Sequence, residues 1–295
     1  MACKVFAFAN QKGGVGKTTC CVNLAASLVL SKQRVLLCDL DPQGNATMGS
    51  GVDKNAVDNS MNDLLQGKIE PIEAVITQTP AGYDLIPANS DLTAAEVVLV
   101  KKSGEPSLAL SKALETIKDD YDYIFLDCPP SLNMLTVNAL VSADAILIAM
   151  QCEYFALEGL TDLVNTVRQL QESLNPQLKI AGIVRTMYDA RNRLSSEVST
   201  QLIEHFGNKV FQTVIPRNVR LAEAPSYGLP VQLYDKHSRG SAAYLALANE
   251  FLRKQQALAK QSAVPKASEI APEVVPAEVV PAEVILAEAV LAEIE

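Results

Sequence analysis

Short apolar runs alternate with stretches of helical periodicity along the first 190 residues of the chain. Near-continuous apolar runs are typical of strands buried on both faces, and helices between them indicate a parallel sheet. The pattern predicts a helix at Lys17–Leu30 and strands at Lys4–Ala9, Arg34–Cys38, Tyr123–Leu126, Ala145–Met150 and Lys179–Thr186. We therefore expect an α/β fold, with a mostly parallel, twisted sheet and helices on both faces. Ligands of such sheets bind at the carboxyl ends of the strands.

The pattern changes after about residue 261, where proline becomes frequent and a glutamate recurs every five residues in a degenerate P-A-E-V-V repeat. A five-residue step turns a helix by about 140°, so these glutamates spiral around it and leave no apolar face. We expect one folded domain over residues 1–261 and a disordered acidic tail over residues 262–295. The tail is either a solvated spacer or a docking segment, and the sequence leaves both open.

The composition is that of a folded, soluble protein, because the 295 residues are 48% hydrophobic and 20% charged. These fractions exclude a disordered or fibrous chain. No apolar stretch reaches the roughly 20 residues of a membrane span, and the first residues lack the apolar core of a signal peptide. We therefore expect a cytoplasmic protein.

The net charge of −9 argues at first against a polyanionic partner, but the charge is unevenly distributed. Residues 1–178 have a net charge of −9, residues 179–260 one of +6, and residues 261–295 one of −6. A basic block thus lies between two acidic ones, and a nucleic-acid partner stays open. The chain has no Trp and only 5% aromatic residues, which disfavours a base-stacking platform for single strands.

The six cysteines show no CxxC pair and no spacing that suits zinc: Cys3, Cys20, Cys21, Cys38, Cys128 and Cys152. In a reducing compartment such cysteines behave as small apolar residues. We expect them to be buried and unpaired.

A glycine-rich loop, residues 10–19 (NQKGGVGKTT), follows the first predicted strand and leads directly into the predicted helix. Glycines let backbone N–H groups surround an anion, and the helix N-terminus adds partial positive charge. Lys17 would reach the β- and γ-phosphates of a nucleotide, and the Thr18 hydroxyl would ligate Mg²⁺. The loop therefore predicts a nucleotide site that uses Mg²⁺.

Aspartates stand at the ends of two predicted strands. Asp39 and Asp41 follow the second strand two residues apart, so they point to the same side. Asp127 ends the apolar run Tyr123–Leu126, as in a Walker B motif. Such carboxylates hold Mg²⁺ through water and orient an attacking water. We expect Asp39 and Asp127, with Thr18, at the metal, although the Asp-Leu-Asp-Pro segment alone is equally compatible with a simple turn.

The glycine-rich loop departs from the standard phosphate-binding loop, with Gln11 in place of the first glycine and an additional lysine, Lys12. This pattern resembles the deviant Walker A motif of the ParA/MinD family of ATPases, and the likeness extends over about residues 4–256. It implies a P-loop ATPase fold in which Lys12 reaches the phosphates of the neighbouring subunit across an ATP-sandwich dimer. It also implies that ATP contacts Gly13, Gly14, Val15, Gly16, Lys17, Thr18 and Thr19.

Further segments resemble ParA proteins. Residues 39–45 (DLDPQGN) are similar to switch I, in which the residue matching Asp41 positions the hydrolytic water. The likeness thus implies Lys12, Lys17 and Asp41 as catalytic residues. The segments around Met187 and Pro216 are similar to those that enclose the adenine. In the chromosomal ParA subgroup, arginines matching Arg191 and Arg220 bind DNA without sequence preference.

The resemblance implies a weak Mg²⁺-dependent ATPase that forms a homodimer with ATP, binds nonspecific double-stranded DNA on the nucleoid and is stimulated by a ParB-type partner. Its role would be chromosome or plasmid partitioning. The alternative is a ParA-like ATPase that positions a protein cargo and has no DNA segregation role. Membrane targeting of the MinD type is disfavoured, because an acidic C-terminus is repelled by anionic lipid. An iron–sulfur reductase is also disfavoured. Such an enzyme needs two cysteines per subunit at the dimer axis, and besides Cys128 no second cysteine stands in a matching loop.

Overall fold

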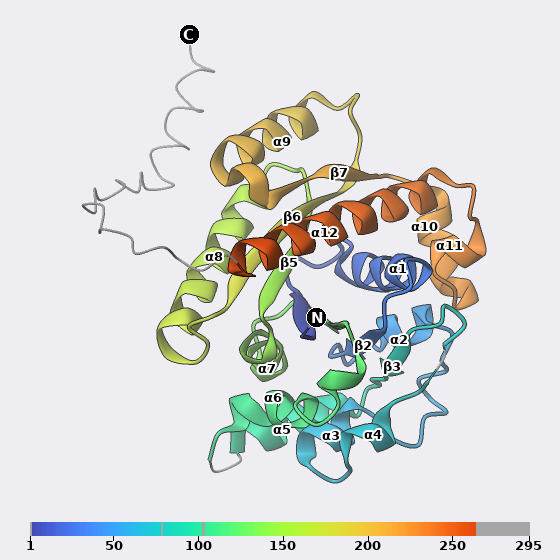
Figure 1. The fold of residues 1–295 in the computed structure, drawn as a ribbon, viewed down its shortest axis with the longest axis vertical. Coiled ribbons are helices and arrows are strands. Elements are labelled where there is room, and N and C mark those ends of the chain that lie inside the picture. Colours follow the sequence, from blue (N-terminus) through green and yellow to red (C-terminus); the bar gives the residue numbers. More distant parts are fainter. Residues whose placement is uncertain (1, 78, 102–103, 264–295) are drawn as a thin grey trace. The chain divides into compact units, whose positions relative to one another are not determined.

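A computed structural model of the chain describes residues 2–77, 79–101 and 104–263. The chain divides into two units, residues 1–251 and residues 252–295. Within the described part of the first unit, seven strands form one sheet in the order β3-β2-β4-β1-β5-β6-β7, and every neighbouring pair is parallel (Figure 1). The strands are β1 (Lys4–Phe8), β2 (Val35–Asp39), β3 (Asp84–Ile86), β4 (Tyr123–Asp127), β5 (Ala145–Gln151), β6 (Lys179–Tyr188) and β7 (Val210–Pro216).

The predicted fold class is confirmed, and the predicted strands all exist with ends that differ by one or two residues. The helix predicted at Lys17–Leu30 has those bounds. Strand β3 (Asp84–Ile86) was not predicted, because three residues are too short for a periodic signal. Strand β7 (Val210–Pro216) is also absent from the predicted strands.

The helical elements connect the strands and continue beyond β7. The α-helices are α1 (Lys17–Leu30), α2 (Asn45–Gly49), α3 (Met61–Gln66), α4 (Pro71–Ala74), α5 (Leu92–Lys101), α6 (Ala109–Leu114), α7 (Met134–Ser142), α8 (Ala156–Ser173), α9 (Arg193–Phe206), α10 (Val219–Glu223), α11 (Val231–Tyr234) and α12 (Arg239–Ala263). Short 3-10 turns are η1 (Pro106–Leu108), η2 (Lys118–Asp120), η3 (Gly207–Lys209) and η4 (Ala224–Tyr227). Ser262 and Ala263, where we expected the tail to begin, are still helical. The rest of the predicted tail, residues 264–295, lies outside the described residues.

The two faces of the sheet bury different side chains. On one face, α1 packs across β1, β2, β4 and β5, and the rings of Phe6, Tyr123, Phe125 and Phe251 contact one another at centroid distances of 5.0–6.5 Å. On the other face, residues of α3 and α5 to α9 form the large aliphatic core. Both faces are covered, which explains why the strands read as nearly continuous apolar runs.

The strand order places the loops of the candidate site together. β1 lies between β4 and β5, and β2 pairs with β4 in a register that sets Asp39 opposite Asp127. Phe8, the last residue of β1, is also paired with Asp127. The glycine-rich loop therefore leaves the sheet beside both strand-end aspartates.

Candidate nucleotide site

The glycine-rich loop has the backbone of an anion cradle. Gly14 and Gly16 have φ values of +73° and +89°, a left-handed conformation that favours glycine. Gly16 precedes the first turn of α1, where no described side chain caps the helix and no acidic residue stands. The N–H groups of that turn, together with the helix dipole, favour an anion in front of the helix. The predicted phosphate contacts of Gly13 to Thr19 thus lie on one continuous loop and helix turn.

Lys17 is the first residue of α1, and its side chain is buried. Its Nζ donates to the backbone carbonyl of Lys12 at 3.3 Å, inside the loop. Burial lowers the pKa of Lys17, while the nearby charges of Asp127 and Asp41 raise it. A buried cation within a cradle of backbone N–H groups suits a ligand that carries several negative charges.

Asp127, at the end of β4, is completely buried. Its two carboxylate oxygens make no hydrogen bond of good geometry with the described residues. Burial raises its pKa well above the ordinary value, and the neighbouring charge of Asp39 raises it further. The Thr18 hydroxyl and Lys17 act in the opposite direction. A buried carboxylate with unsatisfied oxygens beside Thr18 fits the chemistry of a hydrated Mg²⁺.

Asp39 ends β2, and it is fully buried but well bonded. Its Oδ2 accepts from the Thr47 backbone N–H and from the Thr47 hydroxyl, each at 2.8 Å, and its Oδ1 accepts from the Asp41 N–H at 3.1 Å. Burial raises its pKa to about 6, and these hydrogen bonds lower it in part. The role of Asp39 at a metal stays a prediction, because its oxygens are engaged with the protein in this structure.

Asp41 lies two residues beyond β2 and is half-buried. Its Oδ1 accepts from the Gln43 N–H at 3.0 Å, and its carbonyl accepts from the Gly44 N–H at 2.8 Å. The residue therefore stands in a tight turn at the carboxyl edge of the sheet, on the side of Lys17. This placement agrees with a water-positioning role, which no contact in the structure tests.

Lys12 is exposed at the tip of the glycine-rich loop, and its Nζ pairs with Glu153 Oε2 at 2.7 Å. Glu153 lies just beyond β5, so the pair joins the loops that follow two neighbouring strands. The side chains of Lys12 and Glu153 are 42% and 45% exposed. Glu153 was not singled out by the sequence, because its partner is 141 residues away.

Two further residues fix the loop and were also missed. The Thr186 hydroxyl, on β6, donates to the Val15 carbonyl at 2.7 Å. The Asn10 side chain accepts from the Lys12 N–H at 2.9 Å and donates to the Ala149 carbonyl of β5 at 2.8 Å. Asn10 stands inside the motif and could have been found by its position, whereas Thr186 carries no local signal.

Met187 and Pro216, the predicted adenine contacts, lie at the ends of the neighbouring strands β6 and β7, where Tyr188 is paired with Pro216. Met187 has φ +48°, which is uncommon for a residue with a side chain. Strained backbone of this kind concentrates at ligand sites. The structure brings the two residues close in the fold, and their contact with a base stays a prediction.

Three arginines of the basic block of residues 179–260 form ion pairs with carboxylates of the same chain: Arg191, Arg193 and Arg220. Arg191 is bonded to Asp189 at 2.8 Å, and Arg220 to Glu223 at 2.8 Å and Asp235 at 3.3 Å. The Arg191 side chain is 90% exposed and that of Arg220 is 51% exposed. Both are therefore accessible to a partner, but phosphate would have to compete with a carboxylate for each.

Arg185 belongs to the same basic block but is not a surface residue. It is buried and donates to the Ser199 hydroxyl at 2.7 Å and to the Phe211 carbonyl at 2.8 Å. The Arg185 guanidinium therefore links β6, α9 and β7 by hydrogen bonds. Its charge does not face solvent, unlike those of Arg191 and Arg220.

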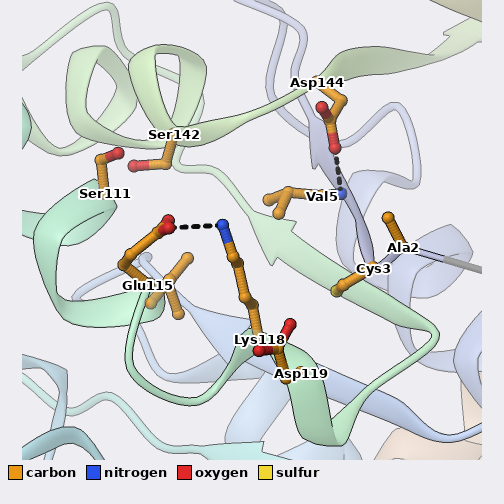
Figure 2. A pocket seen from close by; sticks show the side chains of 10 residues that line it. Ala2, Cys3, Val5, Ser111, Glu115, Lys118, Asp119, Ser142 and Asp144 are labelled. Carbon is orange, nitrogen blue, oxygen red and sulfur yellow. Dashed lines mark hydrogen bonds and ion pairs between the residues drawn. The ribbon is translucent and has the colours of Figure 1, made fainter.

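A cavity of about 240 Å³ lies at the opposite edge of the sheet, at the amino ends of β1 and β5 (Figure 2). Figure 2 shows Lys118 reaching Glu115, at 2.6 Å, and the Val5 N–H donating to Asp144 Oδ2 at 2.8 Å. The lining residues are Ala2, Cys3, Val5, Ser111, Leu114, Glu115, Lys118, Asp119, Ser142 and Asp144. None of them belongs to the candidate nucleotide site.

The cysteines are free thiols, with Cys3 half-buried and the other five buried, as expected. Burial raises the pKa of Cys3 to about 11, so its thiol stays protonated at neutral pH. Among the helices in the described ranges, none has the length and apolar character to cross a membrane.

Comparison with known proteins gives this geometry a family. A family model described as an AAA domain matches residues 3–180. Sporulation initiation inhibitor protein Soj of Bacillus subtilis is 50% identical over 247 residues, which cover 84% of this chain and 97% of Soj. Chromosome partitioning protein ParA of Caulobacter vibrioides is 48% identical over 255 residues, or 86% of this chain and 95% of that protein.

Among solved structures, cobyrinic acid a,c-diamide synthase from Mycobacterium smegmatis, with bound ADP and magnesium, has a TM-score of 0.75 at 36% identity. The match covers 86% of this chain and 95% of the synthase chain. The fold, the glycine-rich loop with its two lysines and the near-complete coverage of Soj and ParA lead to one assignment. The chain belongs to the ParA/Soj family of P-loop ATPases.

Proposed function

We propose that the chain is an ATP-dependent, dimerising Mg²⁺-ATPase that binds DNA nonspecifically in its ATP state and drives chromosome or plasmid partitioning with a ParB-type partner. The observation that carries the proposal is the phosphate loop, in which buried Lys17 stands beside the unsatisfied carboxylate of Asp127. Relatives named for chromosome partitioning are 48–49% identical over 84–86% of this chain. The synthase named among the solved structures is less similar, at 36%.

The residues of the site would divide the work as follows. Backbone N–H groups of residues 13–19 bind the β- and γ-phosphates, and Lys17 neutralises their charge. Thr18 and Asp127 would hold Mg²⁺, which would offset the negative charge that develops on the phosphate during transfer. Asp41 would orient the attacking water in line with the γ-phosphate. Met187 and Pro216 would enclose the base at the edge formed by β6 and β7.

The exposed position of Lys12 supports dimerisation with ATP. Lys12 is exposed, and its Nζ is paired with Glu153 on the surface. An exposed lysine on a phosphate loop is well placed to act on a nucleotide held by a second copy, as an arginine finger does. ATP would thus bridge two subunits through Lys17 of one and Lys12 of the other. The ADP and nucleotide-free chains would lack that bridge.

DNA binding would use the exposed arginines Arg191 and Arg220. Side chains that contact phosphates give affinity without base readout and a steep dependence on salt. A ParB-type protein would stimulate hydrolysis and release the DNA, and nucleoid association would follow from the DNA affinity. The two states of the switch are the free subunit and the dimer. ATP would favour the dimer because a ligand shifts an equilibrium toward the state that it binds more tightly.

One observation favours a second function, the positioning of a protein cargo without DNA. Both candidate arginines are already bonded to carboxylates of the same chain. If these pairs persist in the ATP dimer, these two arginines offer little free positive charge to DNA. A protein partner would then be the cargo, and the ATP switch would be the same.

The ATPase proposal is tested by nucleotide binding and turnover. Lys17→Ala should abolish ATP binding, and Asp41→Ala should retain binding but lose turnover and accumulate the ATP-bound dimer. Thr79→Val, a change at a buried hydroxyl that donates to the Tyr83 carbonyl at 2.8 Å, serves as a control. Normal ATP affinity in Lys17→Ala would remove the phosphate-loop assignment, and normal turnover in Asp41→Ala would place the catalytic carboxylate elsewhere.

A further inference from the structure

The loop that carries Asp41 is held by a buried bridge centred on Thr47. Thr47 lies in the short helix α2 and has no exposed surface. Its hydroxyl donates to Asp39 Oδ2 at 2.8 Å and accepts from the Ala88 N–H at 2.9 Å. Its backbone N–H donates to the same Asp39 oxygen at 2.8 Å. Thr47 thus connects the end of β2 with the segment that follows β3.

The same carboxylate closes the loop between β2 and α2. Asp39 Oδ1 accepts from the Asp41 N–H, and Asp39 Oδ2 accepts from Thr47, so one side chain holds both the start and the end of that loop. Gly44, the N-cap of α2, offers no side chain to the helix, and Asp39 satisfies one of its free N–H groups instead. The position of Asp41 therefore depends on the rotamer of Asp39.

Among the described residues, the Thr47 hydroxyl is one of the three donors that hold that rotamer, and the only one of them that belongs to a side chain. A buried carboxylate whose hydrogen bonds are complete has one favoured orientation, whereas a partly satisfied one can turn toward other donors. Gly44 leaves no room for adjustment, because a Cβ there would lie 2.6 Å from the Ala88 carbonyl. The loop, Asp39 and the Ala88 segment thus form one closely packed unit around Thr47.

We propose that Thr47 is a positioning residue for hydrolysis, which acts through Asp39 on the backbone of Asp41. The inference rests on the proposed function, since it requires Asp41 to orient the attacking water. It assigns Asp39 a structural task that does not depend on a metal. Thr47 itself contacts neither the phosphate loop nor Lys17 in the interactions described above.

The test compares two substitutions at one site. Thr47→Val keeps the shape and removes the hydroxyl, and Thr47→Ser keeps the hydroxyl and removes the methyl group. In Thr47→Val, kcat should fall by about tenfold or more, because small displacements of a catalytic group cost that much. The KM for ATP and the affinity for a fluorescent ATP analogue should stay near those of the unmodified chain. Thr47→Ser should restore kcat, and Thr79→Val should leave it unchanged.

A second readout separates positioning from damage to the fold. Circular dichroism and urea unfolding establish that Thr47→Val is folded at the assay temperature. With ATP, this variant should accumulate dimer, as Asp41→Ala does, because nucleotide binding persists while turnover is slow. In the Asp41→Ala background, Thr47→Val should cause no further loss of turnover.

Three results would count against the inference. Unchanged kcat in Thr47→Val, an equal loss in Thr47→Ser, or a loss of ATP affinity as large as the loss of kcat would each overturn the inference. Normal turnover in Asp41→Ala would instead show that the proposed role of Asp41 is wrong. A slow Thr47→Val with normal ATP affinity, rescued by serine, supports the inference.

Discussion

The ion pair between Lys12 and Glu153 predicts that Glu153→Gln strengthens ATP-dependent dimerisation. In the structure, the 2.7 Å pair holds Lys12 against its own subunit. If Lys12 acts on the nucleotide of a neighbouring subunit, this pair must break in the dimer. Removing the charge of Glu153 should therefore destabilise the free subunit relative to the dimer.

The size of the effect follows from the exposure of the pair. The two side chains are 42% and 45% exposed, and exposed ion pairs contribute about 0.2–1 kcal/mol. Each dimer releases two such pairs, so the gain is about 0.4–2 kcal/mol if the two sites are independent. This range corresponds to a dimer that forms about 2- to 30-fold more tightly.

The assay is sedimentation velocity across a range of protein concentrations with a nonhydrolysable ATP analogue. Glu197→Gln is the matched control, because it removes the same charge from the exposed pair Arg193–Glu197 on α9. A dimer dissociation constant for Glu153→Gln that equals that of the control would show that the pair does not oppose dimerisation. A weaker dimer would show that Glu153 acts across the interface.

Three further predictions concern Asp39, Arg220 and the tail. Burial raises the pKa of Asp39 to about 6 from an ordinary 3.8. The protonated Asp39 carboxyl therefore adds to the free energy of unfolding below pH ~4, and this contribution is lost as pH rises through ~6. The loss is roughly 3 kcal/mol. Urea unfolding of the nucleotide-free chain at pH ~4 and above pH ~6 should show this change in the free energy of unfolding, and the change should be smaller in Asp39→Asn. An equal change in both chains would contradict the assignment. Glu223→Gln with Asp235→Asn frees Arg220 and should tighten DNA binding with ATP, as measured by fluorescence anisotropy. The same double change in an Arg220→Ala background should leave DNA affinity unchanged. Equal tightening in both backgrounds would show only a general charge effect. Truncation after Ala263 removes net negative charge and should raise DNA affinity most at low salt, and equal affinities of the full and truncated chains would leave the tail a spacer.

The fold and the phosphate loop were predictable because their signals are local. Apolar runs buried on both faces predict the parallel sheet. Positions 14 and 16 have positive φ, a conformation that favours glycine, so the loop is visible in the sequence as closely spaced glycines. The short β3 escaped because its three residues carry no period. Strand ends shifted by a residue or two, since the last hydrogen bonds of a strand depend on its neighbours.

The organisation of the site was less predictable, because it depends on pairs of residues far apart in the sequence. Glu153 and Thr186 reach the phosphate loop only because β5 and β6 follow β1 in the sheet. The spacing of Asp39 and Asp41 indicated two carboxylates directed at one site. In the structure, Asp39 is buried under α2 and bonded to Thr47, which only the fold of the β2–α2 loop reveals.

The most direct test of ATP-switched DNA binding is retention of a random-sequence DNA duplex by the full chain with ATP, with ADP and without nucleotide, over a series of salt concentrations. We expect retention with ATP alone and none in Lys17→Ala. Arg191→Ala with Arg220→Ala should reduce the salt slope by about 0.9 for each phosphate that is no longer neutralised, or roughly 3 to 4 in a dimer. A chain that hydrolyses ATP but holds DNA in no nucleotide state, or equally in all of them, would contradict the proposed function.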